Sequence, residues 1–223
     1  MITPDLIIFD CDGVLVDSEV LSCRCLSEVL AGYGITIGTA EIVRLFLGRN
    51  TAAVVQHYAD AGRPIPSTFP DDFAAKVRET FQAALRPIEG IAGVLEGLQQ
   101  DGRHIPYCLA SSSALDRVSL SLSLTRLASY FGGRLYTSQM VKHGKPAPDL
   151  FLYAAERMGA EPRHTLVIED SVSGVTAGKA AGMQVWGFVG GGHYGSHDGR
   201  GPLVEAGADR VFDRMADFWR ADR

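Results

Sequence analysis

The stretch IIFDCDGVLVDSE, residues 7–19, places two aspartates at the end of an apolar run and follows them with a glycine. An apolar run with no polar alternation is typical of a strand buried on both faces of a parallel sheet. Asp10 and Asp12 stand two positions apart, where each carboxylate makes ionisation of the other harder. The pair therefore needs a positive charge close by.

Four later runs resemble the first in being short and rich in β-branched or aromatic residues. Helical patterns lie between them, among them residues 148–158, which begin with a proline and end before Gly159, and residues 171–181, which a serine caps and Gly182 ends. Alternation of strand and helix predicts an α/β fold with a doubly wound, Rossmann-like parallel sheet as its core. The expected strands are residues 5–10, 105–111, 164–170, 184–190 and 209–213.

Residues 18–85 show a different pattern, with helical spacing alone, as in Leu21, Cys25 and Val29. Residues 63–70 contain three prolines and predict an internal connection, and residues 86–91 predict the linker back to the core. We therefore expect a small inserted α-helical domain at residues 18–85. The core domain would consist of residues 1–17 and 86–223.

Composition excludes several classes of partner. The formal net charge is −5, and Lys and Arg are scattered singly, unlike the basic clusters of nucleic-acid binders. The chain opens without signal-peptide features, and no apolar run approaches the roughly 18 residues of a membrane span. We expect a cytoplasmic protein without nucleic-acid or membrane partners, and a monomer or weak homodimer. Its four cysteines form no C-x-x-C pair, and we expect them to be reduced, as is usual in the cytoplasm.

The residues that end the expected strands are the candidates for function, because doubly wound sheets bind ligands beyond the carboxyl ends of their strands. A turn, a helix cap or a solvated surface lysine would explain each of them taken singly. Their convergence on one sheet edge favours a site instead. The groups that would meet there are Asp10, Asp12, Ser111, Ser112, Ser113, Lys145, Glu169 and Asp170.

Several acids and one lysine in a cleft suit a cation together with an anion. The all-oxygen donor set matches the preference of Mg²⁺. Lys145 and the Ser111 hydroxyl would hold the opposite side of an anionic group, most naturally a phosphoryl group. The expected metal ligands are Asp10, the main-chain carbonyl of Asp12, and Glu169 or Asp170.

Four segments together carry a resemblance to a known family. FDCDGVLVDSE, LASSS, KPAPDLF and VIEDSVSGVTAGKAAGM, in this order and at these intervals, resemble the four motifs of the haloacid dehalogenase (HAD) superfamily. The resemblance covers nearly the whole chain. It is to the branch with a helical cap between the first two motifs, which includes β-phosphoglucomutase and sugar-phosphate phosphatases, and it implies that residues 18–85 form this cap.

The resemblance also implies a role for each motif residue. Asp10 would be the nucleophile that forms an aspartyl-phosphate, and Asp12 would protonate the leaving oxygen and later activate water. Ser111 and Ser112, with nearby amides, would bind the phosphoryl oxygens, and Lys145 would neutralise charge. The implied magnesium site consists of Asp10, Asp12, Glu169 and Asp170, of which Glu169 or Asp170 could act through water.

Cap residues would select the substrate. Residues 48–50 resemble the specificity loop of capped members, so that Arg49 could bind a carboxylate or second phosphate, or else face solvent. Glu19 and Ser22 could also face the cleft. Lys76 is the one lysine of the cap, and a solvated position suits it better than the Schiff-base role of a phosphonate hydrolase.

The resulting hypothesis is a Mg²⁺-dependent phosphatase that hydrolyses a small phosphorylated metabolite, most naturally a sugar phosphate. The presence of Asp12 disfavours a dehalogenase, which lacks that acid, and residues 18–22 lack the histidine of β-phosphoglucomutase. A hexose-phosphate mutase and a catalytically idle binding protein remain the alternatives. Residues 190–195, GGGHYG, match the pattern of a dinucleotide-binding fingerprint. The context is wrong, because the SHDGRGP stretch that follows cannot start a helix at once. We expect a flexible loop near the substrate instead.

Overall fold

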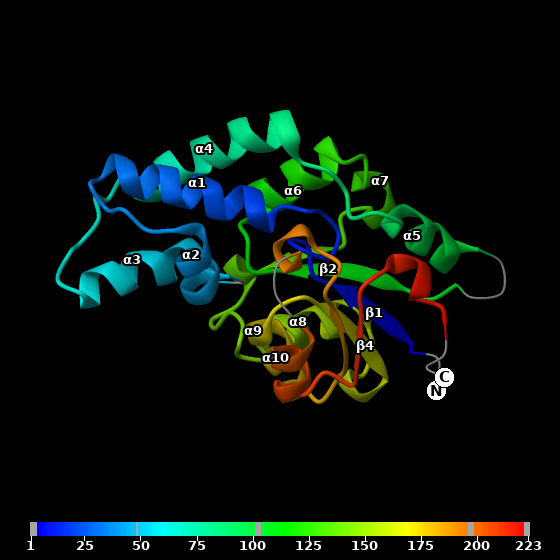
Figure 1. Cartoon of the computed structure of the whole chain (residues 1–223). Coiled ribbons are helices and arrows are strands. Elements are labelled where there is room, and N and C mark those ends of the chain that lie inside the picture. The colour runs from blue at the N-terminus through cyan, green and yellow to red at the C-terminus, as the bar shows by residue number, and fades with distance from the viewer. Residues whose placement is uncertain (1–3, 48, 101–103, 196–198, 221–223) are drawn as a thin grey trace.

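The expected strands pair into one parallel sheet. The computed structural model describes residues 4–47, 49–100, 104–195 and 199–220. Within these ranges, six strands form a sheet of order β3-β2-β1-β4-β5-β6 (Figure 1). Phe9 pairs with Leu109 on one side and with Ile168 on the other, so the carboxyl ends of the three central strands lie at one edge. The strands are β1 (Leu6–Phe9), β2 (Tyr107–Ser111), β3 (Leu135–Thr137), β4 (Thr165–Glu169), β5 (Gln184–Phe188) and β6 (Arg210–Phe212).

The strand order confirms the doubly wound, Rossmann-like α/β core. The order reverses between β1 and β4, which makes this pair the switch point where such sheets bind ligands. All five expected strands are present. β3 is the strand that the sequence analysis missed, because it has only three residues, two of them half-buried, and follows a glycine pair at 132–133.

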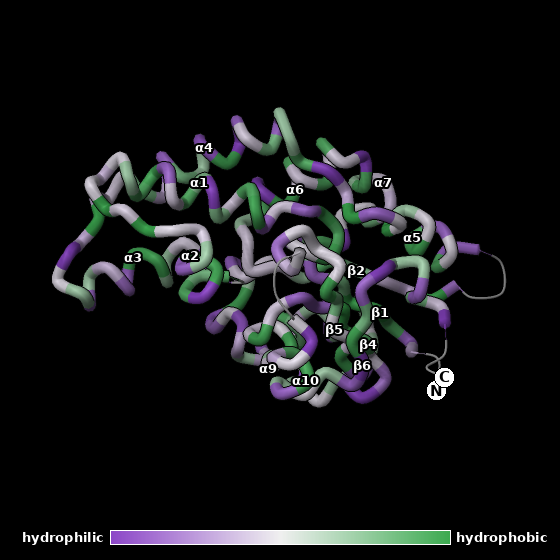
Figure 2. Tube along the Cα trace, in the orientation of Figure 1, coloured by the Kyte–Doolittle hydropathy of each residue, from purple (hydrophilic) through white to green (hydrophobic). Residues whose placement is uncertain are grey.

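Helices cover both faces of the sheet, and Figure 2 shows hydrophobic residues concentrated along the strands between them. Alternate residues of β1 point to opposite faces: Ile7 and Phe9 join one hydrophobic cluster, and Leu6 and Ile8 join the other. This placement explains why the run is apolar at every position. One face is covered by α5 (Ile91–Gln99), α6 (Leu115–Leu124) and α7 (Ala128–Phe131), the other by α8 (Asp149–Met158), α9 (Val172–Ala180) and α10 (Arg200–Glu205).

The two helices that the sequence placed next to the later motifs have the expected ends. Pro148 precedes the first residue of α8, and Gly159 follows its last residue with a left-handed φ of 70°. Ser171 caps α9, and its side chain accepts a hydrogen bond from the main-chain N–H of Gly174. The first turn of α9 therefore begins directly at the carboxyl end of β4.

Every described element between residues 18 and 85 is a helix, as the sequence pattern predicts. Leu30, Ile42 and Phe69 belong to a hydrophobic cluster of this segment, whereas Val77 and Phe81 join a cluster of the sheet. The connection expected at 63–70 is shorter, because the last helix already begins at Phe69. The four helices, called the helical segment below, are α1 (Glu19–Gly32), α2 (Thr39–Phe46), α3 (Thr51–Asp60) and α4 (Phe69–Ala84).

The two chain crossings that lead into and out of the helical segment lie side by side. Asp17 donates its main-chain N–H to the carbonyl of Arg86 at 2.9 Å, and Ile88 donates to Leu15 at 3.0 Å. Figure 1 shows the segment extending from one end of the sheet, where these crossings meet. The paired crossings hold the base of the helical segment directly beside the residues that follow β1.

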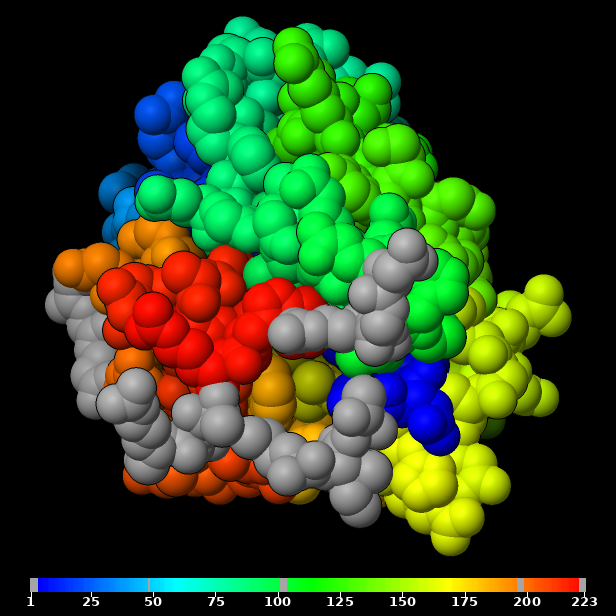
Figure 3. All heavy atoms as spheres, turned by 90° about the vertical axis from the view of Figure 1, so that its right-hand side faces the viewer, coloured from blue at the N-terminus to red at the C-terminus, as the bar shows by residue number. Residues whose placement is uncertain are grey.

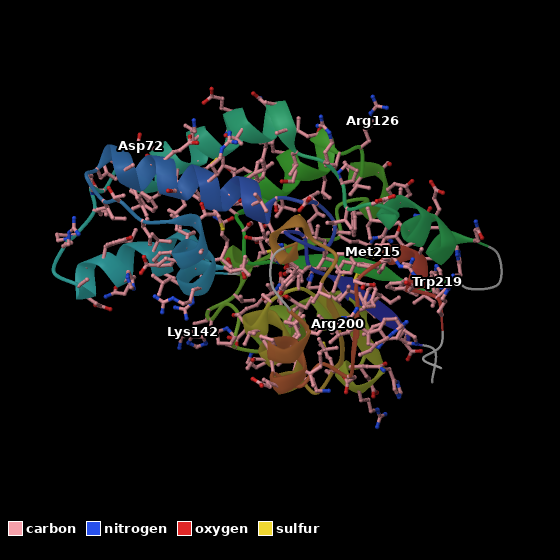
Figure 4. All side chains as sticks on the ribbon, in the orientation of Figure 1. Asp72, Arg126, Lys142, Arg200, Met215 and Trp219 are labelled. Atoms are coloured by element: carbon pink, nitrogen blue, oxygen red, sulfur yellow. The ribbon has the colours of Figure 1, made fainter. Side chains whose placement is uncertain are left out.

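The C-terminal residues close the opposite end of the molecule. Figure 3 shows them packed beside α5, and Figure 4 labels Met215 and Trp219 there. Gly97 makes this packing possible, because a Cβ at that position would lie 3.3 Å from the Trp219 indole nitrogen. None of the helices in the described ranges is long and apolar enough to cross a membrane. The four cysteines are buried and carry free thiols.

Candidate active site

Asp10 lies at the carboxyl edge of the sheet, at the switch point between β1 and β4. Its main-chain N–H donates to Ile168 at 3.0 Å and so continues the pairing of the two strands by one residue. The side chain of Asp10 is buried next to Glu169, which ends β4, and burial raises its pKa well above the usual value. A buried acid of this kind requires a cationic partner.

Lys145 is that partner. Its Nζ donates to Asp10 Oδ1 at 2.5 Å, to Glu169 Oε1 at 2.7 Å and to the carbonyl of Ala110 at 3.1 Å. The lysine side chain is only 2% exposed. Although burial opposes its charge, the two carboxylates outweigh that effect and raise the pKa of Lys145, which is therefore a fixed cation.

Glu169 uses both of its carboxylate oxygens within the protein. Besides Oε1 on Lys145, its Oε2 accepts hydrogen bonds from the N–H and the hydroxyl of Ser171, both at 2.9 Å. A Cβ at Gly174 would lie 1.7 Å from Oε1, so this glycine is required for the close approach of α9. The structure thus places Glu169 as a support of Lys145.

Asp12 has a different environment from Asp10. Its Oδ1 accepts from Ser18 Oγ at 2.6 Å and from Arg117 at 3.0 Å, and its Oδ2 accepts from Ser113 Oγ at 2.6 Å. Burial raises the pKa of this carboxyl, but the Arg117 charge and the three hydrogen bonds outweigh burial and lower it. The two environments therefore shift the pKa values of the two carboxyls in opposite directions, which suits the acids to different roles.

Arg117 is the residue of this site that the sequence analysis missed. It stands in the first turn of α6, and besides Asp12 it donates to Ser22 of α1 at 2.9 Å and lies over the Phe81 ring of α4. Ser18 and Ser113 were not assigned to Asp12 either. One signal was available in the order of the elements. The helix that follows β2 begins at the sheet edge where Asp12 lies, so a side chain in the first turn of that helix can reach Asp12.

Asp170 is the acid best suited to a cation. It is buried, its Oδ2 accepts no hydrogen bond from the described residues, and burial followed by the Glu169 charge raises its pKa well above the usual value. A Cβ at Gly13 would lie 1.8 Å from this oxygen, so the glycine leaves room for it. An unsatisfied buried carboxylate oxygen is costly without a counter-charge.

These acids fit a magnesium ion. Asp10, Asp170 and the main-chain carbonyl of Asp12 supply oxygen only, and Mg²⁺ commonly binds proteins through one or two carboxylates and keeps several waters. Among the residues that the structure describes, no three acidic, histidine or cysteine side chains already form a metal-binding group. Water and substrate oxygens would therefore have to complete the coordination.

A cavity of about 1050 Å³ opens between the sheet edge and the helical segment. Its floor is polar, whereas its far wall includes Leu26, Ile42, Phe46 and Val54 from α1, α2 and α3. The cavity brings together the site residues that the sequence predicted, far apart in the chain. They are Asp10, Asp12, Glu19, Ser22, Arg49, Ser111, Ser112, Ser113, Lys145, Glu169 and Asp170.

The remaining predicted substrate residues have distinct positions. Ser111 Oγ accepts from the N–H of Ser113 at 3.0 Å, and the Ser112 carbonyl accepts from Ser138 at 2.8 Å, so main-chain and side-chain contacts fix this turn. Glu19 begins α1, and its pKa is raised to about 8 by burial and then by the Asp12 charge. Arg49 is exposed and lines the cavity just before α3, while Gly48, of the same predicted loop, lies outside the described residues.

Lys76 lies outside the cavity lining, whereas the loop at residues 190–195 lies beside Asp170. Lys76 of α4 forms a 2.8 Å ion pair with Glu28, and the hydrogen bond raises its pKa, whereas a Schiff-base lysine needs a lowered one. His193, within the loop expected at 190–195, is buried beside Asp170. The SHDGRGP stretch spans residues 196–202, of which 196–198 lie outside the described residues, and α10 begins within it at Arg200.

Comparison with known proteins gives consistent matches. The chain is 36% identical over 188 residues to a probable pseudouridine-5'-phosphatase of Drosophila melanogaster, covering 80% of this chain and 78% of that one. It is 28% identical over 186 residues to the 6-phosphogluconate phosphatase of Escherichia coli, covering 82% of each. A HAD family hydrolase of Deinococcus radiodurans, solved with bound phosphate and sodium, matches with a TM-score of 0.76 and 34% identity, covering 97% and 93% of the two chains.

The family model for haloacid dehalogenase-like hydrolases matches residues 7–188. This range contains the whole cavity floor, from Asp10 to Asp170, together with the helical segment. The match therefore agrees with the resemblance seen in the four motifs and with the strand order. Sequence, fold and site all assign this chain to the haloacid dehalogenase-like hydrolase family.

Proposed function

We propose that the protein is a magnesium-dependent phosphatase that hydrolyses a small phosphorylated metabolite, most naturally a sugar phosphate, through an aspartyl-phosphate. The observation that carries this proposal is the pairing of buried Lys145 with Asp10 at the cavity floor. Asp12, two positions after Asp10 in the chain, pairs with a different cation, Arg117. A nucleophile, its neutralising cation and a second acid with a different pKa are the groups that phosphoryl transfer through a carboxylate needs.

In the first step, an Asp10 oxygen attacks phosphorus, and the bond from phosphorus to the leaving oxygen breaks. Asp12, which must carry a proton once the substrate is bound, gives it to that oxygen, so the products are the alcohol, an ionised Asp12 and an aspartyl-phosphate. In the second step, Asp12 takes a proton from water while the water oxygen attacks phosphorus, and the bond to Asp10 breaks. Phosphate leaves, and both aspartates return to their starting state.

The remaining residues stabilise charge and hold the substrate. Lys145 neutralises charge on Asp10 and on the phosphoryl oxygens, and Ser111 with Ser112 would bind those oxygens from the other side. Asp10, Asp170 and the Asp12 carbonyl would hold Mg²⁺, with Glu169 contributing through Lys145 or a water. The ion supplies positive charge that stabilises the phosphoryl oxygens in the transition state.

The helical segment, residues 18–85, would be the cap of this enzyme. Its apolar wall limits the access of water to the cavity, and its polar residues near the opening would sort substrates. The main-chain N–H of Arg49 donates to Phe46, but its guanidinium has no hydrogen bond or ion pair with the described residues and could bind a carboxylate or a second phosphate. The relatives described above, a 6-phosphogluconate phosphatase and a probable pseudouridine-5'-phosphatase, support a substrate of this kind.

A panel of phosphorylated metabolites tests the proposal, with an aryl phosphate as a general substrate and β-glucose 1-phosphate plus a bisphosphate as the mutase assay. We expect phosphate release that stops on chelation of divalent metal and returns with Mg²⁺. Isomer formation without phosphate release would identify a mutase. Silence with every compound, the aryl phosphate included, would favour a binding protein on the same fold.

A further inference from the structure

The glycine-rich loop at residues 190–195 has no role in the mechanism above. It follows β5 and lies beyond residue 188, where the family match ends. The loop contains one turn of 3₁₀ helix, Gly192–Tyr194, which contacts α1. The prediction of a flexible loop near the substrate therefore needs correction, since packing and hydrogen bonds hold it in place.

His193 is buried against the cation-binding acid. Its side chain is 1% exposed, and its Nε2 lies 3.3 Å from Asp170 Oδ2, a close polar contact rather than a hydrogen bond. Two glycines leave room for the ring, because a Cβ at Gly191 would lie 2.8 Å from His193 Cε1, and one at Gly13 would lie 3.2 Å from it. The imidazole and the Asp170 carboxylate thus share a space that glycines on both sides keep open.

The next residue holds the main chain of the same acid. The hydroxyl of Tyr194 donates to the carbonyl of Asp170, and the Tyr194 ring packs on His193 with centroids 4.1 Å apart. Gly199 is required for the ring, since a Cβ there would lie 2.0 Å from Tyr194 Cε1. Consecutive residues of the loop therefore contact both the side chain and the backbone of Asp170.

Main-chain hydrogen bonds attach the loop to two other parts of the protein, the residues before α1 and strand β6. The N–H of Gly192 donates to Asp17 Oδ1 at 2.9 Å, immediately before α1, and the N–H of Val189 donates to Phe212 of β6 at 2.9 Å. A Cβ at Gly192 would lie 2.9 Å from Asp17 Oδ2. The loop thus connects the sheet, the entry to the helical segment and Asp170.

We propose that His193 is a positioning residue for the cation site, whose imidazole, supported by Tyr194, holds the Asp170 carboxylate in the orientation that binds Mg²⁺. The role rests on the proposed function, because it requires Asp170 to be a metal ligand. Side chains that orient a metal-binding carboxylate commonly change metal affinity about 10–100-fold when replaced. Without His193, the carboxylate would lose the contact that restricts its rotation.

The test is a calorimetric titration of the substrate-free protein with MgCl₂, which reads binding independently of turnover. We expect His193→Leu to weaken Mg²⁺ binding about 10–100-fold and His193→Gln, which keeps a polar nitrogen, to recover part of the loss. Tyr194→Phe, which removes only the hydroxyl, should weaken binding less. His164→Leu is the matched control, because His164 also pairs with an aspartate, Asp5 at 3.2 Å, but at the amino end of β4.

The outcomes distinguish failure of the positioning role of His193 from failure of the magnesium-dependent function. Wild-type affinity in both His193 variants would overturn the positioning role and leave the proposed phosphatase intact. Equal losses in the Leu and Gln variants would also overturn it, because packing alone would then explain the effect. A wild-type protein that binds no divalent cation would overturn the magnesium-dependent function itself, and this role with it. Melting temperatures of the metal-free variants show whether each one is folded.

Discussion

Lys145 donates a 2.5 Å hydrogen bond to Asp10 across 135 positions of sequence, and the same ammonium group binds Glu169. One buried cation therefore serves two buried acids. Removal of Lys145 would leave both carboxylates without compensation, which affects folding as well as chemistry. This relationship links the stability of the sheet edge to its activity.

Lys145→Met should lower turnover of an aryl phosphate by at least about 10²–10³-fold, because charge on the phosphoryl group and on Asp10 would no longer be neutralised. It should also destabilise the protein by about 3–5 kcal/mol at neutral pH, as the loss of one partner of a buried ion pair does. Urea unfolding measures the second effect. Lys179→Met removes a half-buried lysine that pairs with Asp209 away from the cavity, and it should change neither quantity much. Near-normal turnover in Lys145→Met would exclude its catalytic role.

Arg117→Met should alter the pH profile of kcat/KM. The arginine lowers the pKa of Asp12, so its removal raises that pKa, and the limb of the profile that reports Asp12 should move to higher pH. Because Asp12 must be protonated in the step that kcat/KM reports, the loss of kcat/KM should be smallest at alkaline pH. Arg24→Met, at an exposed position of α1, is the control. A profile that only scales down, with unshifted limbs, would mean that Arg117 is merely structural.

Glu19 should make the metal-free protein less stable as pH rises. Its folded pKa, about 8, lies above the usual value of 4.5, so the folded state keeps a proton that the unfolded chain has already released. The contribution of Glu19 to the free energy of unfolding is constant below about pH 4.5 and falls as the pH rises from there through about 8. Glu19→Gln should flatten the curve of melting temperature against pH over this window. An unchanged slope would show that Glu19 is not the responsible group.

Arg49→Ala should raise KM for phosphorylated substrates that carry a second anionic group, and leave an aryl phosphate nearly unaffected. The expected loss is about 10–100-fold, since a charge-assisted hydrogen bond contributes roughly 1.5–3 kcal/mol. Arg63→Ala, an exposed arginine between α3 and α4, provides the control. Equal losses for both kinds of substrate would assign Arg49 to the structure of the helical segment.

Sequence reasoning located the parts of the site that depend on strand ends. Asp10, Ser111 and Glu169 follow or end apolar runs, and parallel strands place such residues at one edge whatever the details of packing. Lys145 was found because four motifs occurred together. These inferences needed only the order of elements and the chemistry of the side chains.

Contacts that depend on tertiary packing were beyond that reasoning. The reach of Arg117 to Asp12 depends on how α6 packs against α1 and α4, and nothing local to residue 117 indicates it. Glu169 was expected at the metal directly or through a water, which stays a prediction, but its hydrogen bonds to Lys145 and Ser171 were not anticipated. His193 lay in a loop whose glycines indicated flexibility, whereas they allow close packing against Asp170.

The most direct test of the account is to find the covalent intermediate. Substrate is mixed with the enzyme in excess, the reaction is quenched in acid, and the peptides are mapped by mass spectrometry. With an aryl phosphate, whose leaving group needs little protonation, the account predicts one added phosphoryl group on Asp10. More of it should accumulate in Asp12→Ala, where water activation is lost, and none should form in Asp10→Asn, which should be inactive. A phosphoryl group on another residue, or normal turnover by Asp10→Asn, would contradict it.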